Sequence, residues 1–259
     1  MAKQLNFMDL THRAKLTYLA HLAKGVTKQH HAWMKFLLRK FIYNDSIILD
    51  IGGHSGQYAK LFARLAPQGK VYSFEPGSYP RSILELSVRF NRLHNVVVIG
   101  KGVGAEAGML NLVTPLKDNG VFRFGLGHIG TKEHCSSTET EEVPVTSIDL
   151  FAVDFGLKNL DFIKIDVEGW EAQILKGGSK TIRRYCPTML VELVASQLSR
   201  TGDDLEAVWA MLLSWGYNPY VHVDKYTLVL HPDPRDGDTF WVHDRLLPLD
   251  NGMIASGVD

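Results

Sequence analysis

The residues with the clearest chemical potential follow a short apolar run near the start of this 259-residue chain. Ile47–Ile51 is apolar except for Asp50, and it runs directly into the glycine-rich turn Gly52-Gly53-His54-Ser55-Gly56. Glycines let the backbone turn tightly and approach a ligand closely. Apolar residues at helical spacing follow, and the exposed amides of a new helix end favour a negative ligand group. A strand, a glycine turn and a helix predict the opening unit of a nucleotide-binding α/β fold.

The spacing of this turn does not match the fingerprint Gly-x-Gly-x-x-Gly of dinucleotide-binding proteins. Counted from Gly52, the second and third glycine positions hold His54 and Gln57. Asp50 would repel a phosphate just before the turn, whereas a carboxylate there suits a ligand with a cationic end. S-adenosylmethionine carries an ammonium, a sulfonium, a carboxylate and a ribose, but no phosphate. We therefore expect S-adenosylmethionine as the cofactor.

A second acid, Glu75, ends the next apolar run at 70–75. An acid at such a strand end can accept hydrogen bonds from two vicinal ribose hydroxyls. Because NAD-binding folds use the same device, Glu75 indicates a nucleoside and does not specify the group at its other end. The alternative is an exposed acid at the end of a strand.

Asp166 and Glu168 form a third group of candidate residues, after the apolar run 161–166. Residues two apart in an extended segment point to the same side, and Lys164 shares that side. Three roles compete: a buried ion-pair network, oxygen ligation of a divalent cation, and removal of a proton from a substrate hydroxyl. Methyl transfer from a sulfonium needs close positioning first, and a base only if the hydroxyl is poorly acidic.

His128 is the histidine that we expect as a base or substrate contact, because it lies among glycines at 124–130. Residues 100–145 are predicted to be irregular apart from a hairpin through 109–113. Acceptor specificity is expected to depend on residues 115–142 and 1–44. No His or Cys spacing resembles a metal site, so no metal ligands are assigned and a divalent cation is only an alternative.

Apolar runs alternate with helical patterns along the rest of the chain. Strands are predicted at 47–51, 70–75, 96–99, 161–166 and 188–194, which indicates a parallel sheet with right-handed crossovers. A hairpin at 217–223 and 226–230 and a final strand at 240–243 complete it.

Residues 1–44 differ from the remainder, because they hold eight Lys and Arg but only Asp9 as an acid. Two apolar stripes at helical spacing predict two amphipathic helices packed against the main domain: Leu16, Leu19, Ala20 and Ala23, then Trp33, Phe36, Leu37 and Phe41. The basic residues are expected to form a solvated face. The alternative is a contact with an anionic substrate carrier or with a membrane surface.

The overall composition fits an ordinary globular enzyme. Lys plus Arg and Asp plus Glu both total 28, so no nucleic-acid partner is expected. Two cysteines give no disulfide framework, no apolar run reaches the roughly 20 residues of a membrane span, and no signal peptide is recognised. We expect a cytoplasmic protein that could form a homo-oligomer.

Several stretches of the chain resemble, in the right order, the FkbM-type methyltransferases. The most specific is Asp-Phe-Ile-Lys-Ile-Asp-Val-Glu-Gly-Trp-Glu at 161–171, and the others lie at 49–58, 71–76, 145–149, 174–177 and 190–192. Two features depart from the family pattern: His54-Ser55 in the turn, and the basic N-terminus.

The resemblance implies a class I methyltransferase fold: a Rossmann-like, seven-stranded, mostly parallel sheet with helices on both faces, a reversed last strand and, here, an N-terminal helical extension. It divides the chain into an extension (1–44), a catalytic domain (45–245) and a tail (246–259). It also implies S-adenosylmethionine-dependent methylation of a hydroxyl on a saccharide, glycolipid precursor or natural product. The rivals are a nucleotide-dependent oxidoreductase and a non-catalytic binding module.

By the same resemblance, six residues would contact the cofactor and two would serve catalysis beside His128. The residues assigned to the methionine end are Asp50, Gly52, Gly53 and Gly56, and Ser55 of the same turn is expected to contact the cofactor although it departs from the family pattern. Glu75 would hold the ribose and Val103 would border the adenine. Asp166 and Glu168 match the family's own Asp-Val-Glu-Gly motif.

Overall fold

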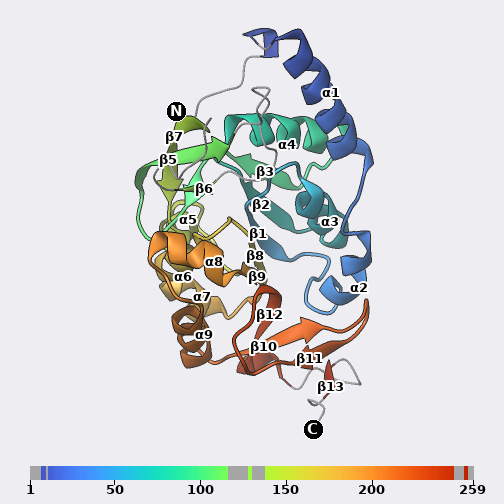
Figure 1. The fold of residues 1–259 in the computed structure, drawn as a ribbon. Helices are drawn as coiled ribbons and strands as arrows, with labels where there is room; N and C mark the ends of the chain where they lie inside the picture. The colour runs from blue at the N-terminus through green and yellow to red at the C-terminus, as the bar shows by residue number, and fades with distance from the viewer. Residues whose placement is uncertain (1–6, 10, 116–127, 130–137, 248–253, 256–259) are drawn as a thin grey trace.

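The fold is built on a central nine-stranded sheet in a computed structural model that describes residues 7–9, 11–115, 128–129, 138–247 and 254–255 (Figure 1). The strand order is β13-β11-β10-β12-β9-β8-β1-β2-β3. The strands are β1 (Ile47–Ile51), β2 (Lys70–Phe74), β3 (Val96–Ile99), β8 (Phe162–Ile165), β9 (Thr188–Leu193), β10 (Tyr217–His222), β11 (Leu228–Leu230), β12 (Gly237–His243) and β13 (Ile254–Ala255).

Seven of these strands have the predicted mostly parallel arrangement. β3, β2, β1, β8 and β9 pair in parallel, whereas β12 runs antiparallel to both β9 and β10 and is the predicted reversed strand. The predicted Rossmann-like fold class is therefore confirmed. The sheet is wider than the seven strands expected, because β11 adds to β10 as the second arm of the predicted hairpin and β13 pairs in parallel with β11.

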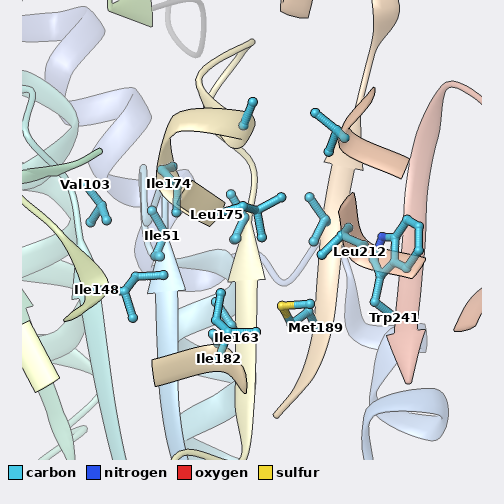
Figure 2. Packing of buried hydrophobic residues seen from close by; sticks show 14 of the residues in the cluster. Ile51, Val103, Ile148, Ile163, Ile174, Leu175, Ile182, Met189, Leu212 and Trp241 are labelled. Atoms are coloured by element: carbon cyan, nitrogen blue, oxygen red, sulfur yellow. The ribbon is translucent and has the colours of Figure 1, made fainter. Parts of the chain in front are cut away.

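Helices cover both faces of the sheet (Figure 1). On one side lie α3 (Gln57–Leu65) and α4 (Ser78–Phe90), and on the other α5 (Ile148–Asp154), α6 (Glu171–Gly177), α7 (Ser179–Tyr185) and α9 (Leu205–Ser214). Alternate strand residues face opposite layers. Ile163 and Ile165 therefore pack with α5, α6 and α7 in the layer of Figure 2, whereas Phe162 packs under α3. The remaining short helices are α8 (Ala195–Leu198), η3 (Ser199–Thr201) and η4 (Asp244–Leu246).

A second, four-stranded sheet occupies much of the segment predicted to be irregular. Its order is β4-β7-β5-β6, formed by β4 (Gly102–Val103), β5 (Gly108–Pro115), β6 (His128–Ile129) and β7 (Thr138–Thr146). β5 and β7 pair over their full length, from Gly108 with Val145 to Pro115 with Thr138. The expectation of irregular structure was wrong here, because the polar run at 136–142 concealed a long strand.

The N-terminal segment forms η1 (Phe7–Asp9), α1 (His12–Thr27), η2 (Ala32–Met34) and α2 (Lys35–Leu38). α1 lies along α4, and its Tyr18 packs with Tyr79 and Ile83. The predicted packing stripe of α1 was wrong: Leu16 is 71% exposed and Leu19 is 50% exposed, and Ala20 and Ala23 are exposed too. The helix turns its Tyr18 face inward because the larger aromatic ring buries more apolar surface than the leucines would.

The second predicted stripe is confirmed in part, since Leu37 and Phe41 lie in the main core whereas Trp33 is 37% exposed and Phe36 is half-buried. Leu37 and Phe41 are buried, and the Phe41 ring lies 5.9 Å from the ring of Phe240 in β12. Residues 34–42 therefore contribute to the same apolar cluster as β10 and β12. No helix in the described part of the chain is both long and apolar enough to cross a membrane.

Candidate functional site

A cavity of about 300 Å³ opens at the carboxyl ends of β1, β2 and β8. Its walls come from the glycine turn after β1, the segment after β2, the Asp166–Trp170 turn after β8, and parts of β4, β5 and β7. In open α/β sheets, ligands bind where the parallel strands end. The position predicted for a cofactor site is thus hollow and lined by several of the residues named from the sequence.

Seven of the ten predicted site residues line this cavity: Gly52, Gly53, Ser55, Glu75, Val103, Asp166 and Glu168. Asp50 and Gly56 are not among the lining residues: Asp50 lies in β1 and Gly56 directly precedes α3. His128 lies in β6, opposite Val113 of β5, and its side chain falls outside the described part of the structure.

The glycine turn uses its own amides to hold itself to the sheet. Gly52 and Gly53 both donate to the carbonyl of Phe74, at 3.1 and 2.9 Å. His54 N donates to Glu75 Oε2 at 2.8 Å, and Gly56 N donates to Gly53 O at 2.8 Å. A pyrophosphate cradle needs such N–H groups pointing at the ligand. These four turn amides are therefore occupied by protein acceptors, and the attraction of a negative ligand group to the first amides of α3 stays a prediction.

Gly52 is required by the approach of two strand ends. Its φ is +84°, and a Cβ at this position would lie 1.9 Å from the carbonyl oxygen of Asp166. No side chain fits there, so this glycine lets the β1 turn and the β8 turn come together at the cavity floor. The close approach of these two turns, as well as the approach of a ligand, thus explains why residue 52 is a glycine.

Glu75 is buried at the cavity wall and partly satisfied by backbone donors. Its Oε2 accepts from His54 N at 2.8 Å and its Oε1 accepts from Gly77 N at 2.9 Å. Burial raises its pKa to about 7, although both backbone hydrogen bonds act in the opposite direction. A carboxylate has about four acceptor positions, so roughly two stay available for a pair of ligand hydroxyls.

Asp50 is fully buried and does not reach the cavity. Its Oδ2 accepts from Ser73 Oγ at 2.7 Å, and no described residue donates to its Oδ1. Burial raises the pKa of Asp50, against the opposing effect of Lys164 and Ser73. The strand explains this position, because residue 50 faces the α3 side of the sheet whereas its neighbours Leu49 and Ile51 face the other layer.

Asp166 is instead the carboxylate beside the turn that reaches the cavity. Its Oδ2 lies 3.1 Å from Lys164 Nζ, which also donates to Gly52 O at 3.0 Å. Burial alone would raise the pKa of Asp166, but Lys164 outweighs burial and holds that pKa below its ordinary value. Lys164 in turn keeps its charge, since Asp166 and Asp50 raise its pKa more than burial lowers it. The predicted ion pair on this face is therefore present.

Glu168 lines the same end of the cavity in an unusual backbone conformation. Its φ is +61°, and its Oε2 accepts from Gln197 Nε2 at 2.7 Å. Burial and the charge of Asp166 raise its pKa. A left-handed conformation at a non-glycine residue costs about 1–3 kcal/mol and is often retained at functional sites. Glu171 helps to impose the turn, because its Oε1 accepts from Val167 N and Gly169 N.

Two further acids stand behind Asp166 and were not predicted from the sequence. Glu192 of β9 pairs in register with Asp238 of β12, and Glu192 hydrogen-bonds to Asp166. Burial and Asp166 raise the pKa of Glu192 to about 8 and also raise the pKa of Asp238. The raised pKa of Glu192 favours its protonated form, which can donate to Asp166. The signal for Glu192 was available, since it lies one residue before the end of β9, whereas Asp238 has no motif.

The N-terminal extension contributes His31 to the cavity wall, which the sequence also did not predict. The His31 ring stacks on Tyr58 of α3, with centroids 4.8 Å apart, and Lys164 Nζ lies 5.3 Å from the same Tyr58 ring. Burial lowers the pKa of His31, with Asp238 opposing. A histidine held largely neutral at pH 7 can accept a proton.

The cavity also has an apolar lining. It is formed by Val103 of β4, Leu112 of β5 and Phe74, which are buried, and by Trp170. An apolar lining of this kind suits the faces of a purine base. The placement of Val103 thus agrees with a border role for the adenine, which stays a prediction.

Among the described residues, no group of three or more His, Cys, Asp or Glu side chains could hold a metal ion. The S-adenosylmethionine predicted from the sequence fits the residues that are present. Glu75 offers free acceptor positions for a ribose, Asp166 offers a negative charge at the turn, and the apolar lining suits a base.

Comparison with known proteins identifies methyltransferases that are similar to more than half of this chain. The chain is 24% identical over 179 residues to the 2-O-methyltransferase NoeI of Sinorhizobium fredii, which covers 64% of this chain and 72% of that protein. It is 26% identical over 167 residues to methyltransferase 1 of Beauveria bassiana, covering 60% of this chain and 67% of the relative. A solved O-methyltransferase of Bacillus cereus, in complex with S-adenosylhomocysteine, superposes with a TM-score of 0.49 at 12% identity, covering 92% and 93% of the two chains.

The family profile described as the methyltransferase FkbM domain matches residues 50–219, which run from the end of β1 into β10. This match spans the glycine turn, Glu75 and the Asp166–Trp170 turn, and it leaves out His31 and Asp238. The resemblance seen in the sequence is confirmed: the chain belongs to the FkbM methyltransferase family.

Proposed function

We propose that this protein is an S-adenosylmethionine-dependent O-methyltransferase that acts on a hydroxyl of a saccharide, a glycolipid precursor or a natural product. The observation that carries the proposal is the cavity at the strand ends, where Glu75 keeps acceptor positions free beside the glycine turn of a chain in a methyltransferase family.

The occupied amides of the turn favour S-adenosylmethionine over NAD. Four N–H groups between Gly52 and Gly56 already bond to protein acceptors, so they do not offer a pyrophosphate the cradle that it needs. The adjacent charge is the carboxylate of Asp166, which would repel a phosphate and attract a cationic group. A nucleotide-dependent oxidoreductase is therefore the weaker reading.

Transfer to a hydroxyl oxygen is supported by a relative, since the protein from Sinorhizobium fredii is named a 2-O-methyltransferase. When bound, S-adenosylmethionine supplies an electrophilic methyl group. The chain must hold the acceptor in line and, for a weakly acidic hydroxyl, take up its proton.

Three described groups at the Asp166 end can serve that role. Asp166 is held ionised by Lys164, so it orients groups by charge and is a weak base. Glu168 and His31 both line the cavity. Burial and Asp166 raise the pKa of Glu168 toward neutral pH, whereas burial lowers the pKa of His31 and leaves it uncharged but a weaker base. Proton transfer is most effective when the pKa of the base lies near the working pH. His128, the third catalytic residue predicted from the sequence, keeps that assignment as a prediction.

Separate thermal-shift titrations with S-adenosylhomocysteine and with NADH test the cofactor. We expect S-adenosylhomocysteine to raise the melting temperature and NADH to leave it unchanged, because a ligand that binds only the folded state stabilises it. Stabilisation by NADH alone would refute the proposal.

The reaction is tested by transfer of a labelled methyl group to a panel of saccharides and glycolipid precursors. Product should be sensitive to mild base if the methyl group formed an ester, and resistant if it formed an ether on a hydroxyl, so the linkage identifies the accepting oxygen. A protein that binds S-adenosylhomocysteine but methylates no hydroxyl in the panel would favour the non-catalytic binding module.

A further inference from the structure

Glu141 of β7 carries an oxygen that the fold does not use. Its Oε2 accepts from both Ser78 N and Ser78 Oγ, at 3.1 and 2.9 Å, and so holds the first residue of α4. Its Oε1 is buried, and no described residue donates to it. A buried acceptor without a donor destabilises the folded protein, and a bound ligand that donates to this oxygen would remove that cost.

The position of this oxygen relates it to the cofactor cavity. Glu141 lines the cavity and lies directly opposite Leu112, which is part of the apolar lining of the same cavity. Glu75 Oε1 is held by Gly77 N, and Glu141 Oε2 is held by the next residue, Ser78. The two carboxylates are thus anchored at adjacent residues on one wall, with the Leu112 side chain close to Gly77.

The segment after β3 offers no alternative acid at this end. Lys101, Gly102 and Val103 line the cavity there, and none of them has a carboxylate. A purine packed against Leu112, beside Gly77, would present its edge to polar groups of the cavity wall that include Glu141. Adenine carries an exocyclic amine, a donor, at that edge, whereas hypoxanthine carries an oxygen, an acceptor. A carboxylate only accepts, so it distinguishes between the two bases.

We propose that Glu141 Oε1 accepts the exocyclic amine of the cofactor's adenine and makes the site selective for an amino-purine. This inference rests on the proposed function, because it takes S-adenosylmethionine as the cofactor. It adds a residue from the second sheet that neither the glycine turn nor the strand-end acids indicate.

Calorimetric titration with S-adenosylhomocysteine and with its deaminated analogue, S-inosylhomocysteine, tests the assignment without any methyl acceptor. The wild-type protein should bind S-adenosylhomocysteine about 10- to 100-fold more tightly, because hypoxanthine would place an acceptor against a buried acceptor.

The decisive variant is Glu141→Gln, which preserves size. Ser78 N fixes the amide oxygen of the glutamine in the Oε2 position, so the amide NH2 group turns to the cavity and donates. The preference for the adenine analogue should disappear or reverse, since the new donor matches the oxygen of hypoxanthine. Glu142→Gln is the matched control, because this neighbour is exposed on the other side of β7 and should keep the wild-type preference.

The outcomes separate this inference from the proposed function. Wild-type protein that binds neither ligand would overturn the cofactor and Glu141 assignments together. Wild-type protein that binds both equally, or a folded Glu141→Gln variant with an unchanged preference, would overturn only the role of Glu141 and leave it as a cap of α4. Unfolding curves of the variants check that the fold is retained.

Discussion

The two ends of the cavity are built on different principles. At the Glu75 end, one acid is held by two backbone N–H groups, and apolar residues complete the wall. At the Asp166 end, charged side chains hold one another: Lys164 pairs with Asp166, Glu192 hydrogen-bonds to Asp166, and Asp238 stands beside Glu192. The first arrangement leaves acceptor positions free for a ligand, and the second sets the charge around a reacting group. The difference predicts that one end controls cofactor affinity and the other controls turnover.

The largest effect is expected for Glu75→Ala. Loss of two hydrogen bonds to a charged acceptor, each worth about 1.5–3 kcal/mol, should weaken S-adenosylhomocysteine binding about 10²- to 10⁴-fold. Calorimetry measures the change, and Glu106→Ala serves as the control because Glu106 is exposed. An unchanged Kd would remove Glu75 from the ribose site and erase the contrast between the two ends.

The Asp166 end should show the converse pattern. Asp166→Asn or Glu168→Gln is expected to lower kcat about 10²-fold, the lower range for a group that assists proton transfer, and to change cofactor affinity far less. Methyl-transfer kinetics and calorimetry on the same preparations separate the two quantities. If turnover survives in both variants, the acids serve the turn alone. Activity that persists after chelation with EDTA would argue against the cation alternative.

Cofactor binding should also depend on pH through the Glu75 end. The pKa of Glu75 is raised to about 7, and only the ionised form offers its full acceptor capacity to two hydroxyls. Affinity for S-adenosylhomocysteine should therefore rise about tenfold between pH 6 and pH 8, as this carboxyl loses its proton. The free energy of unfolding changes in the opposite direction. Because the pKa of Glu75 is raised in the folded state, its contribution to stability is lost as pH rises from 4.5 through 7. Glu75→Gln should flatten the binding profile, and a slope that persists there belongs to another group.

The smallest effect is expected at His31. Removing its stacked contact with Tyr58, worth about 0.5–1.5 kcal/mol, should raise the KM for the acceptor roughly threefold in His31→Gln and leave cofactor affinity unchanged. His30→Gln is the matched control, because His30 is exposed and precedes it in the chain. If His31 also acts as the base, kcat falls too and the acidic limb of the pH–rate profile shifts.

The sequence predicted the Glu75 end well because its signals are local. The glycine turn and the acid after β2 each follow a strand within a few residues, and the strand order then places them together. The fold class followed from the same alternation. Asp50 shows the limit of this reasoning, because its motif position was clear but its direction depended on which helix covers that face of the sheet.

The Asp166 end and the second sheet were harder to predict from the sequence, because they join segments that are distant along the chain. Asp238 and His31 have no motif of their own and come from outside the family match at 50–219. Glu141 lay in a polar run that hid the strand β7. In each case the position depends on tertiary packing, which overrides local preference. The prediction of which face of α1 packs against the domain was wrong for the same reason.

The contact between Phe41 and Phe240 has a consequence for how the protein is made. The residues around Phe41 are translated well before β12, the strand that helps to cover them. Until β12 has been made, Leu37, Leu38 and Phe41 lack part of their apolar cover, and docking them on β12 closes a long loop. The part of the cavity wall that carries His31 therefore reaches its final form only after β12 has been synthesised.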